Sequence, residues 1–167
     1  MPRMSKETFI TYMRNFIFGA EDSLVSTVGL LSGIATAGVT RASIIITGII
    51  LIFVEAFSMA VGTFLAEQTT EESLSKNKVP VKTNVISGII MLASYFVAGV
   101  IPLSPYLIES IKNPFWSSIV LALISLFILG AISAEALKTK IWHNAIRMFL
   151  IGGSAVAIGA LIGQLLN

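Results

Sequence analysis

The sequence predicts an all-α integral membrane protein with five transmembrane helices, and three observations lead to this prediction. The chain has 167 residues, of which 55% are hydrophobic and 12% are charged, whereas a soluble domain carries about twice that share of charge. Five segments approach the roughly 20 apolar residues that a helix needs to cross a bilayer. Lysine and arginine collect in alternate connections, as in a chain that crosses a membrane repeatedly.

The five predicted spans make up a single transmembrane domain over residues 1–167. Their approximate bounds, in chain order, are residues 22–39, 42–66, 84–103, 115–136 and 146–166. The first span is rich in Gly, Ser and Thr and is the least hydrophobic, so we expect it to lie inside the bundle or line a path rather than face lipid. Pro102 and Pro105 are expected to end the third span, because proline interrupts helical hydrogen bonding.

The segment before the first span has an amphipathic pattern. Its apolar residues fall on or near one helical face over about residues 5–18, which predicts a short helix lying in the membrane interface. An ordinary cytosolic lead-in accounts for the same pattern equally well.

The basic residues predict the orientation of the chain. Nine of them lie before the first span, between spans two and three, or between spans four and five: Arg3, Lys6, Arg14, Lys76, Lys78, Lys82, Lys138, Lys140 and Arg147. The opposite side carries only Arg41 and Lys112. Because cytoplasmic loops are enriched in basic residues, we expect the N-terminus in the cytoplasm and the C-terminus outside the cell or in a lumen.

The composition excludes several classes of function. The chain has no cysteine and a single histidine, His143, which excludes disulfides, thiol catalysis and histidine-rich metal sites. It has no basic patch for nucleic acid, and neither a nucleophile–base pair nor a phosphate-binding loop is visible. We therefore expect neither an enzyme nor a nucleic-acid-binding protein, and no permanently bound cofactor.

Two acidic residues and one methionine stand out within the predicted spans. Glu55 lies in the middle of the second span, where an ionisable side chain is costly unless it is protonated, hydrated or bound to a cation. Met59 follows one turn later on the same face; alone it would indicate packing, but a carboxylate with a thioether suits Fe²⁺ or Mn²⁺ better than Ca²⁺ or Mg²⁺. At the start of the first span, Glu21 is expected to be a helix-start charge, whereas Asp22 fits that role and an ion-binding role equally.

Three acidic residues follow the second span in the predicted cytoplasmic loop: Glu67, Glu71 and Glu72. Carboxylates at the cytoplasmic end of a path would collect cations before transport. A solvated run of charge is the plainer interpretation of the same residues.

Small residues recur at intervals of four in two of the apolar segments. The pairs Gly29–Gly33 and Gly159–Gly163 form GxxxG patterns, which allow helices to approach closely. Packing within one subunit accounts for these patterns. Because five short spans enclose little volume, we also expect a homodimer with a polar path between its subunits.

Four stretches of the chain resemble the vacuolar iron transporter family, in the order in which that family has them. They are GAEDSLVSTVGLLSGIATAG, EAFSMAVGTFLAEQTTEE, SYFVAGVIPLSPYLI and MFLIGGSAVAIGALIGQLL. The resemblance covers nearly the whole chain. It implies a five-helix membrane domain that dimerises around a metal path and moves Fe²⁺ or Mn²⁺ out of the cytoplasm in exchange for protons.

The resemblance also implies roles for individual residues. The family's first-helix aspartate matches Asp22 and its second-helix methionine matches Met59, so both are expected in the ion path. The family's intramembrane glutamate falls near Leu51 here, and Glu55 lies one turn further along. The family's cytoplasmic metal-binding insert after the second helix is reduced to a short loop, in which only the three acidic residues named above would take its place.

The sequence therefore predicts a dimeric transporter of Fe²⁺ or Mn²⁺ that works by proton antiport in a lipid bilayer. The short chain without the insert favours a prokaryotic cell membrane over a vacuolar or other internal membrane. Two alternatives stay open. One is a proton-coupled carrier or channel for another cation or small solute on the same scaffold, and the other is a membrane scaffold subunit that transports nothing.

Overall fold

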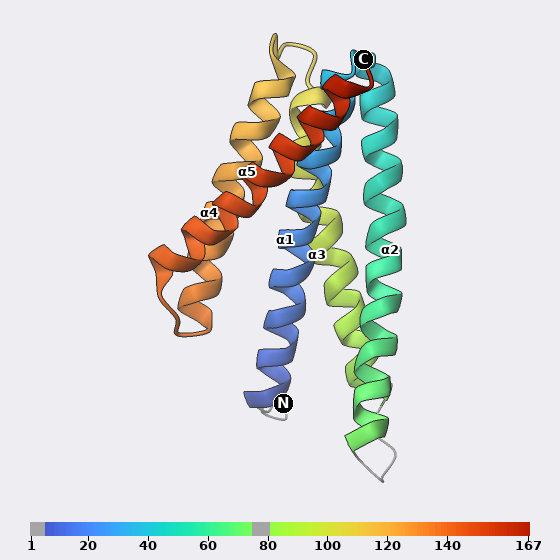
Figure 1. The fold of residues 1–167 in the computed structure, drawn as a ribbon. Helices are drawn as coiled ribbons and strands as arrows, with labels where there is room; N and C mark the ends of the chain where they lie inside the picture. The colour runs from blue at the N-terminus through green and yellow to red at the C-terminus, as the bar shows by residue number, and fades with distance from the viewer. Residues whose placement is uncertain (1–5, 75–80) are drawn as a thin grey trace.

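The computed structural model describes residues 6–74 and 81–167. Within these residues five helices follow one another: α1 (Lys6–Thr36), α2 (Arg41–Leu74), α3 (Val81–Leu107), α4 (Pro114–Ala136) and α5 (Ile141–Leu165). Each of the five is long and apolar enough to cross a membrane, which confirms the prediction of an all-helical membrane protein. The start of α1 and the C-terminal end of the chain lie at opposite ends of the bundle (Figure 1), as an odd number of crossings requires.

The N-terminal region differs from the prediction. The interfacial helix expected over residues 5–18 and the span expected from Asp22 form one continuous helix, α1, which begins at Lys6. Gly19 lies within this helix and packs closely against α3, where an added Cβ would clash with Ser94 Oγ and lie 2.8 Å from Met91 Sδ. As a result Glu21 and Asp22 lie near the middle of α1, where the favourable interaction of acids with a helix start does not apply.

α3 continues past both prolines that were expected to end the third span. Pro102 and Pro105 lie inside the helix, which ends at Leu107. Pro105 has no N–H to donate to the carbonyl of Ile101, and the hydroxyl of Ser104 donates to that carbonyl instead, at 2.8 Å. Because a side chain satisfies the freed carbonyl, the proline is tolerated within the membrane-spanning helix.

α1 is the central helix of the bundle. It contacts each of the other four described helices, whereas α2 contacts only α1 and α3 among them. Its side chains Leu24, Val28 and Leu31 are almost fully buried. Large apolar side chains on α2 and α5 are exposed instead, as expected for surfaces that face lipid. The expectation that the first span lies inside the bundle is therefore confirmed.

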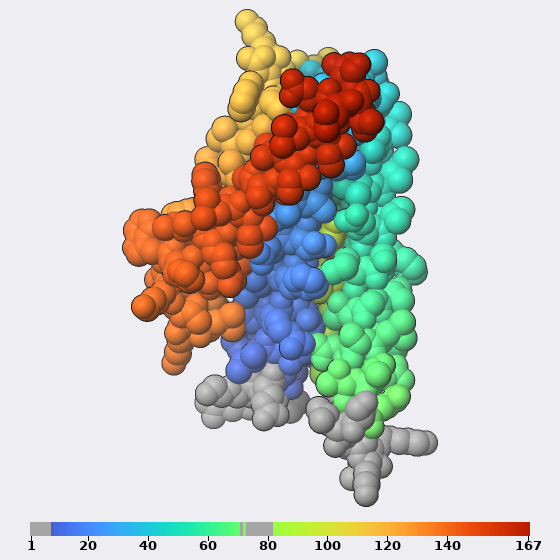
Figure 2. All heavy atoms as spheres, viewed as in Figure 1, coloured from blue at the N-terminus to red at the C-terminus, as the bar shows by residue number. Residues whose placement is uncertain are grey.

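α5 crosses the face of α1 through small residues of both helices (Figures 1 and 2). Gly29 lies against the backbone of Ala155, and an added Cβ on Gly33 would come within 2.9 Å of the carbonyl oxygen of Gly159. Gly163 in turn fits against the backbone of Gly33. The two GxxxG patterns thus meet within one subunit, and packing inside the chain accounts for their spacing.

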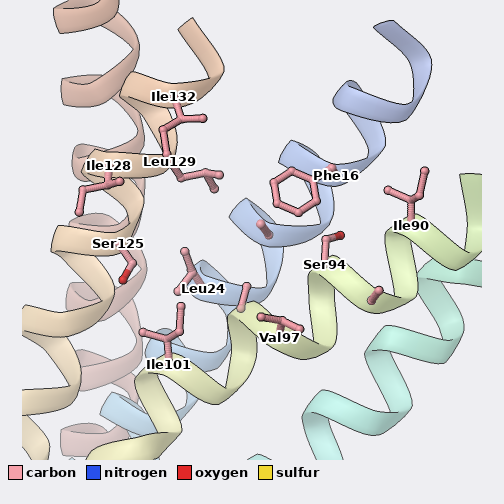
Figure 3. Close-up of a pocket in the computed structure, with 13 residues that line it drawn as sticks. Phe16, Leu24, Ile90, Ser94, Val97, Ile101, Ser125, Ile128, Leu129 and Ile132 are labelled. Atoms are coloured by element: carbon pink, nitrogen blue, oxygen red, sulfur yellow. The ribbon is translucent and has the colours of Figure 1, made fainter. Parts of the chain in front are cut away.

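An apolar groove opens between α1, α3 and α4 (Figure 3). Its volume is about 510 Å³, and side chains such as Phe16, Ile101 and Leu129 line it. Ser94 and Ser125 are the only polar side chains among its described lining residues. Since this lining holds no charged group, the groove is unsuited to binding an ion.

Replacing Gly159 by alanine is expected to destabilise the protein by about 1–3 kcal/mol, the usual cost of overpacking a tight contact. The new methyl group would meet the backbone of Gly29. Gly153, on the same helix, has no described atom within 4 Å of an added Cβ. Gly153→Ala is therefore the matched control, and should leave stability unchanged or raise it slightly because alanine favours helix. Thermal unfolding in detergent, followed by circular dichroism, compares the two; equal midpoints would show that the α1–α5 contact is not tight.

Candidate functional site

Glu55 lies near the middle of α2, on a different side from the lipid-facing residues of that helix. Its neighbours Phe53, Val54 and Phe57 are each more than half exposed, whereas Glu55 is half-buried. The Oε2 atom of Glu55 accepts a hydrogen bond from the phenol of Tyr95 in α3. The most unusual acid in the predicted spans therefore points toward a neighbouring helix.

Tyr95 connects three helices at this level of the bundle. Its side chain is completely buried, and its hydroxyl oxygen, which donates to Glu55, lies 2.7 Å from Ser26 Oγ in α1. Ser23 Oγ, also in α1, donates to the backbone carbonyl of Tyr95 at 2.6 Å. Sequence reasoning did not identify Tyr95. The available signal was a tyrosine in the middle of an apolar span, where its hydroxyl needs a partner.

Asp22 brings a second carboxylate to the same region. It is half-buried near the middle of α1 and lies within electrostatic reach of both Glu55 and Tyr95. In the described part of the chain, the one ion pair is between Arg14 and Glu67, so neither Asp22 nor Glu55 is paired with a basic side chain. Two acids on adjacent helices therefore lie near the middle of the bundle without a basic partner, an arrangement that attracts a cation or protons.

The described acids and histidine of one chain do not supply a complete set of metal ligands. The described residues contain no group of three or more His, Cys, Asp or Glu side chains placed to hold a metal together. Near the two carboxylates lie the hydroxyls of Ser26 and Tyr95. Met59 lies one turn beyond Glu55 on α2 and is half-buried. An octahedral ion such as Mn²⁺ takes six ligands, so the remaining ones would be water or groups from a second copy of the chain.

Glu21 has surroundings that differ from those of its neighbour Asp22. The guanidinium of Arg147 in α5 lies within electrostatic reach of Glu21. Successive residues of a helix point about 100° apart, so the side chains of these two acids face different neighbouring helices. The prediction that Glu21 is a helix-start charge is wrong, because α1 begins well before it, at Lys6.

The acids that follow the second predicted span have separate partners where they are described. Glu67 accepts hydrogen bonds from Arg14 at 2.7 Å and from Asn15 at 3.3 Å, both in α1. Glu72 is exposed and accepts a hydrogen bond from a glutamine of its own helix. The side chain of Glu71 lies outside the described part of the structure. The role of all three in cation capture stays a prediction.

Comparison with known proteins identifies the family. The model of the VIT family matches residues 13–85 and residues 72–164, which together take in parts of all five helices and every residue discussed above in the middle of the bundle. No curated protein matches the chain. The resemblance to the vacuolar iron transporter family that the sequence motifs indicated is confirmed, and the chain belongs to the VIT family, a family of membrane metal transporters.

Proposed function

We propose that this protein moves Fe²⁺ or Mn²⁺ out of the cytoplasm in exchange for protons. The observation that carries the proposal is the pair Asp22 and Glu55, two carboxylates on adjacent helices that have no basic partner among the described residues. Family membership supports metal transport in general. Carboxylate and hydroxyl oxygens with the Met59 thioether nearby favour Fe²⁺ or Mn²⁺ over Ca²⁺ and Mg²⁺.

The charge of the carboxylate pair explains how metal and protons are exchanged. An ionised aspartate at the centre of a membrane helix costs about 3 kcal/mol, and one divalent cation offsets the charge of both Asp22 and Glu55. When the cation leaves, protons take its place on the carboxylates. Because metal and protons compete for the same oxygens, a proton gradient directed into the cytoplasm drives metal outward.

Tyr95 and Ser26 hold Glu55 in both charge states. Each hydroxyl is able to donate or accept a hydrogen bond. When Glu55 is ionised, Tyr95 donates to it and accepts from Ser26. When Glu55 is protonated, both hydrogen bonds reverse direction and Glu55 donates to Tyr95. The carboxyl group thus keeps a partner throughout the transport cycle.

The proposed path lies between two copies of the chain. Asp22, Glu55 and Met59 all keep partly exposed surface in a single subunit, which a homodimer would cover while it supplies further ligands. The distribution of basic residues favours a cytoplasmic N-terminus. With this orientation and the short cytoplasmic loop, a prokaryotic cell membrane is the proposed location.

Transport by the purified protein in liposomes tests the proposed function. Liposomes that carry the wild-type protein and contain a metal-sensitive dye in an acidic solution are expected to take up Fe²⁺ or Mn²⁺ and to release protons. Asp22→Asn and Glu55→Gln should each lower the transport rate at least about tenfold. Replacing even a residue that only hydrogen-bonds a metal ligand typically lowers metal affinity or activity by about that factor. Proton flux that does not depend on metal would favour a carrier for another cation. Metal flux unchanged in both variants would exclude these residues from the path.

Tyr95→Phe is expected to lower the apparent metal affinity about tenfold and to make protons compete more strongly with metal, because ionised Glu55 loses its donor. Tyr106 provides the matched control. It lies in the same helix and is equally buried, but its hydroxyl has no hydrogen-bond partner among the described residues. Transport measured at several pH values should be altered in Tyr95→Phe and unaltered in Tyr106→Phe; equal behaviour of the two variants would contradict the role of Tyr95.

A further inference from the structure

A second polar site lies between α1 and α2, nearer the N-terminal end of α1 than Asp22 is. It is a cavity of about 480 Å³ whose lining includes Arg14 and Asn15 of α1, Thr63 and Glu67 of α2, and Met91 of α3. The Oε1 atom of Glu67 accepts from the Arg14 guanidinium at 2.7 Å and from the Asn15 amide at 3.3 Å. Both contacts join α1 to α2, near the N-terminal end of α1 and the C-terminal end of α2.

The partners in this site differ in how firmly they are held. The side chain of Arg14 is 65% exposed, whereas that of Glu67 is 17% exposed and Asn15 is 5% exposed. Arg14 is therefore able to swing into water, while the acid and the amide stay between the helices. An ion pair with one exposed partner is weak, and a divalent cation carries twice the charge of a guanidinium. Such a cation is a strong competitor for the Glu67 carboxylate.

Helical spacing links this cavity to the carboxylate pair in the middle of the bundle. Four residues of α2 follow one another at intervals of four and so form one stripe: Glu55, Met59, Thr63 and Glu67. On α1, Asn15 and Asp22 are two turns apart on one side of the helix. Asn15 contacts one end of the α2 stripe, and Asp22 lies within electrostatic reach of the other end. Residues of α1 therefore lie near both ends of this stripe, although the stripe turns by about 120° around α2 between Glu55 and Glu67, because four residues span about 400°.

We propose that Glu67 and Asn15 form the entry site for the transported cation, and that Arg14 occupies this site until the ion displaces it. The inference rests on the proposed function, which supplies the identity of the ion. Arg14 acts as a tethered competitor that pairs with the half-buried acid when no metal is present. Entry then requires an ion that outcompetes a guanidinium, which favours divalent over monovalent cations at the mouth of the path.

The kinetics of Arg14→Gln test this entry site in liposomes. Loss of the competitor should lower the KM for Mn²⁺ about two- to fivefold without lowering the maximal rate. This factor corresponds to the free energy of an exposed ion pair. Glu67→Gln should raise the KM. In the double variant the KM should match that of Glu67→Gln alone, because Arg14 has nothing to compete for once the carboxylate is gone.

Lys82→Gln is the matched control, since Lys82 is an exposed basic residue at the start of α3, on the same predicted cytoplasmic side. Its KM should equal that of the wild type; the same fall as in Arg14→Gln would assign the effect to surface charge and overturn the proposal. A KM that is unchanged or raised in Arg14→Gln would overturn it as well.

Binding of Mn²⁺ to the purified protein, followed by electron paramagnetic resonance, separates this proposal from the proposed function. If the wild-type protein moves no metal, the proposed function fails. The entry site then still predicts tighter Mn²⁺ binding in Arg14→Gln and weaker binding in Glu67→Gln than in the wild type. Equal Mn²⁺ binding by all three proteins would overturn the entry site even if transport is observed.

Discussion

A carboxylate in the middle of a bilayer must be protonated, hydrated or matched by a cation, and the arrangement of α1, α2 and α3 follows from this constraint. Glu55 is half-buried between apolar stretches of α2, and its carboxylate accepts a hydrogen bond from Tyr95. Tyr95 is in turn fixed by Ser26 and Ser23 of α1. Asp22 brings a second carboxyl group within electrostatic reach of Glu55. The three helices thus converge on a site whose charge a divalent cation is suited to balance.

The position of Asp22 depends on how α1 packs on both of its sides. On one side, Gly99 of α3 leaves room for Ser23, whose oxygen would lie 2.7 Å from an added Cβ on Gly99. On the other side, the glycines of α1 and α5 bring the two backbones together. A central helix with small residues on opposite sides accepts close neighbours on both. This explains why the least hydrophobic span is also the one that contacts all four others.

Much of the fold could be predicted from the sequence because it depends on local properties. Hydrophobic length identifies the five helices, and an acid in an apolar stretch identifies Glu55 without knowledge of its neighbours. The continuity of α1 was not predicted, because the amphipathic pattern of residues 5–18 and the two acids Glu21 and Asp22 indicated a boundary, whereas α1 runs unbroken from Lys6 to Thr36. Helix α3 likewise continues past Pro105 because a hydroxyl replaces the missing donor.

The partners within the site were beyond prediction for a different reason. Tyr95 and Glu55 are 40 residues apart, and Arg14 and Glu67 are 53 apart, so only the packing of the helices shows that they meet. A tyrosine in one span and an arginine near the start of another have many ordinary roles when each is considered alone. The motif resemblance indicated Asp22 and Met59, but it did not indicate what holds Glu55 or what pairs with Glu67.

The central claim is that Asp22 and Glu55 share one divalent transition-metal ion. Crystals of the protein soaked in Mn²⁺ test it most directly, because anomalous scattering locates manganese independently of the protein atoms. The account predicts an anomalous peak within coordination distance of both carboxylates, absent in crystals of Glu55→Gln treated in the same way. Manganese bound elsewhere only, or a peak at this site that persists in Glu55→Gln, would contradict it.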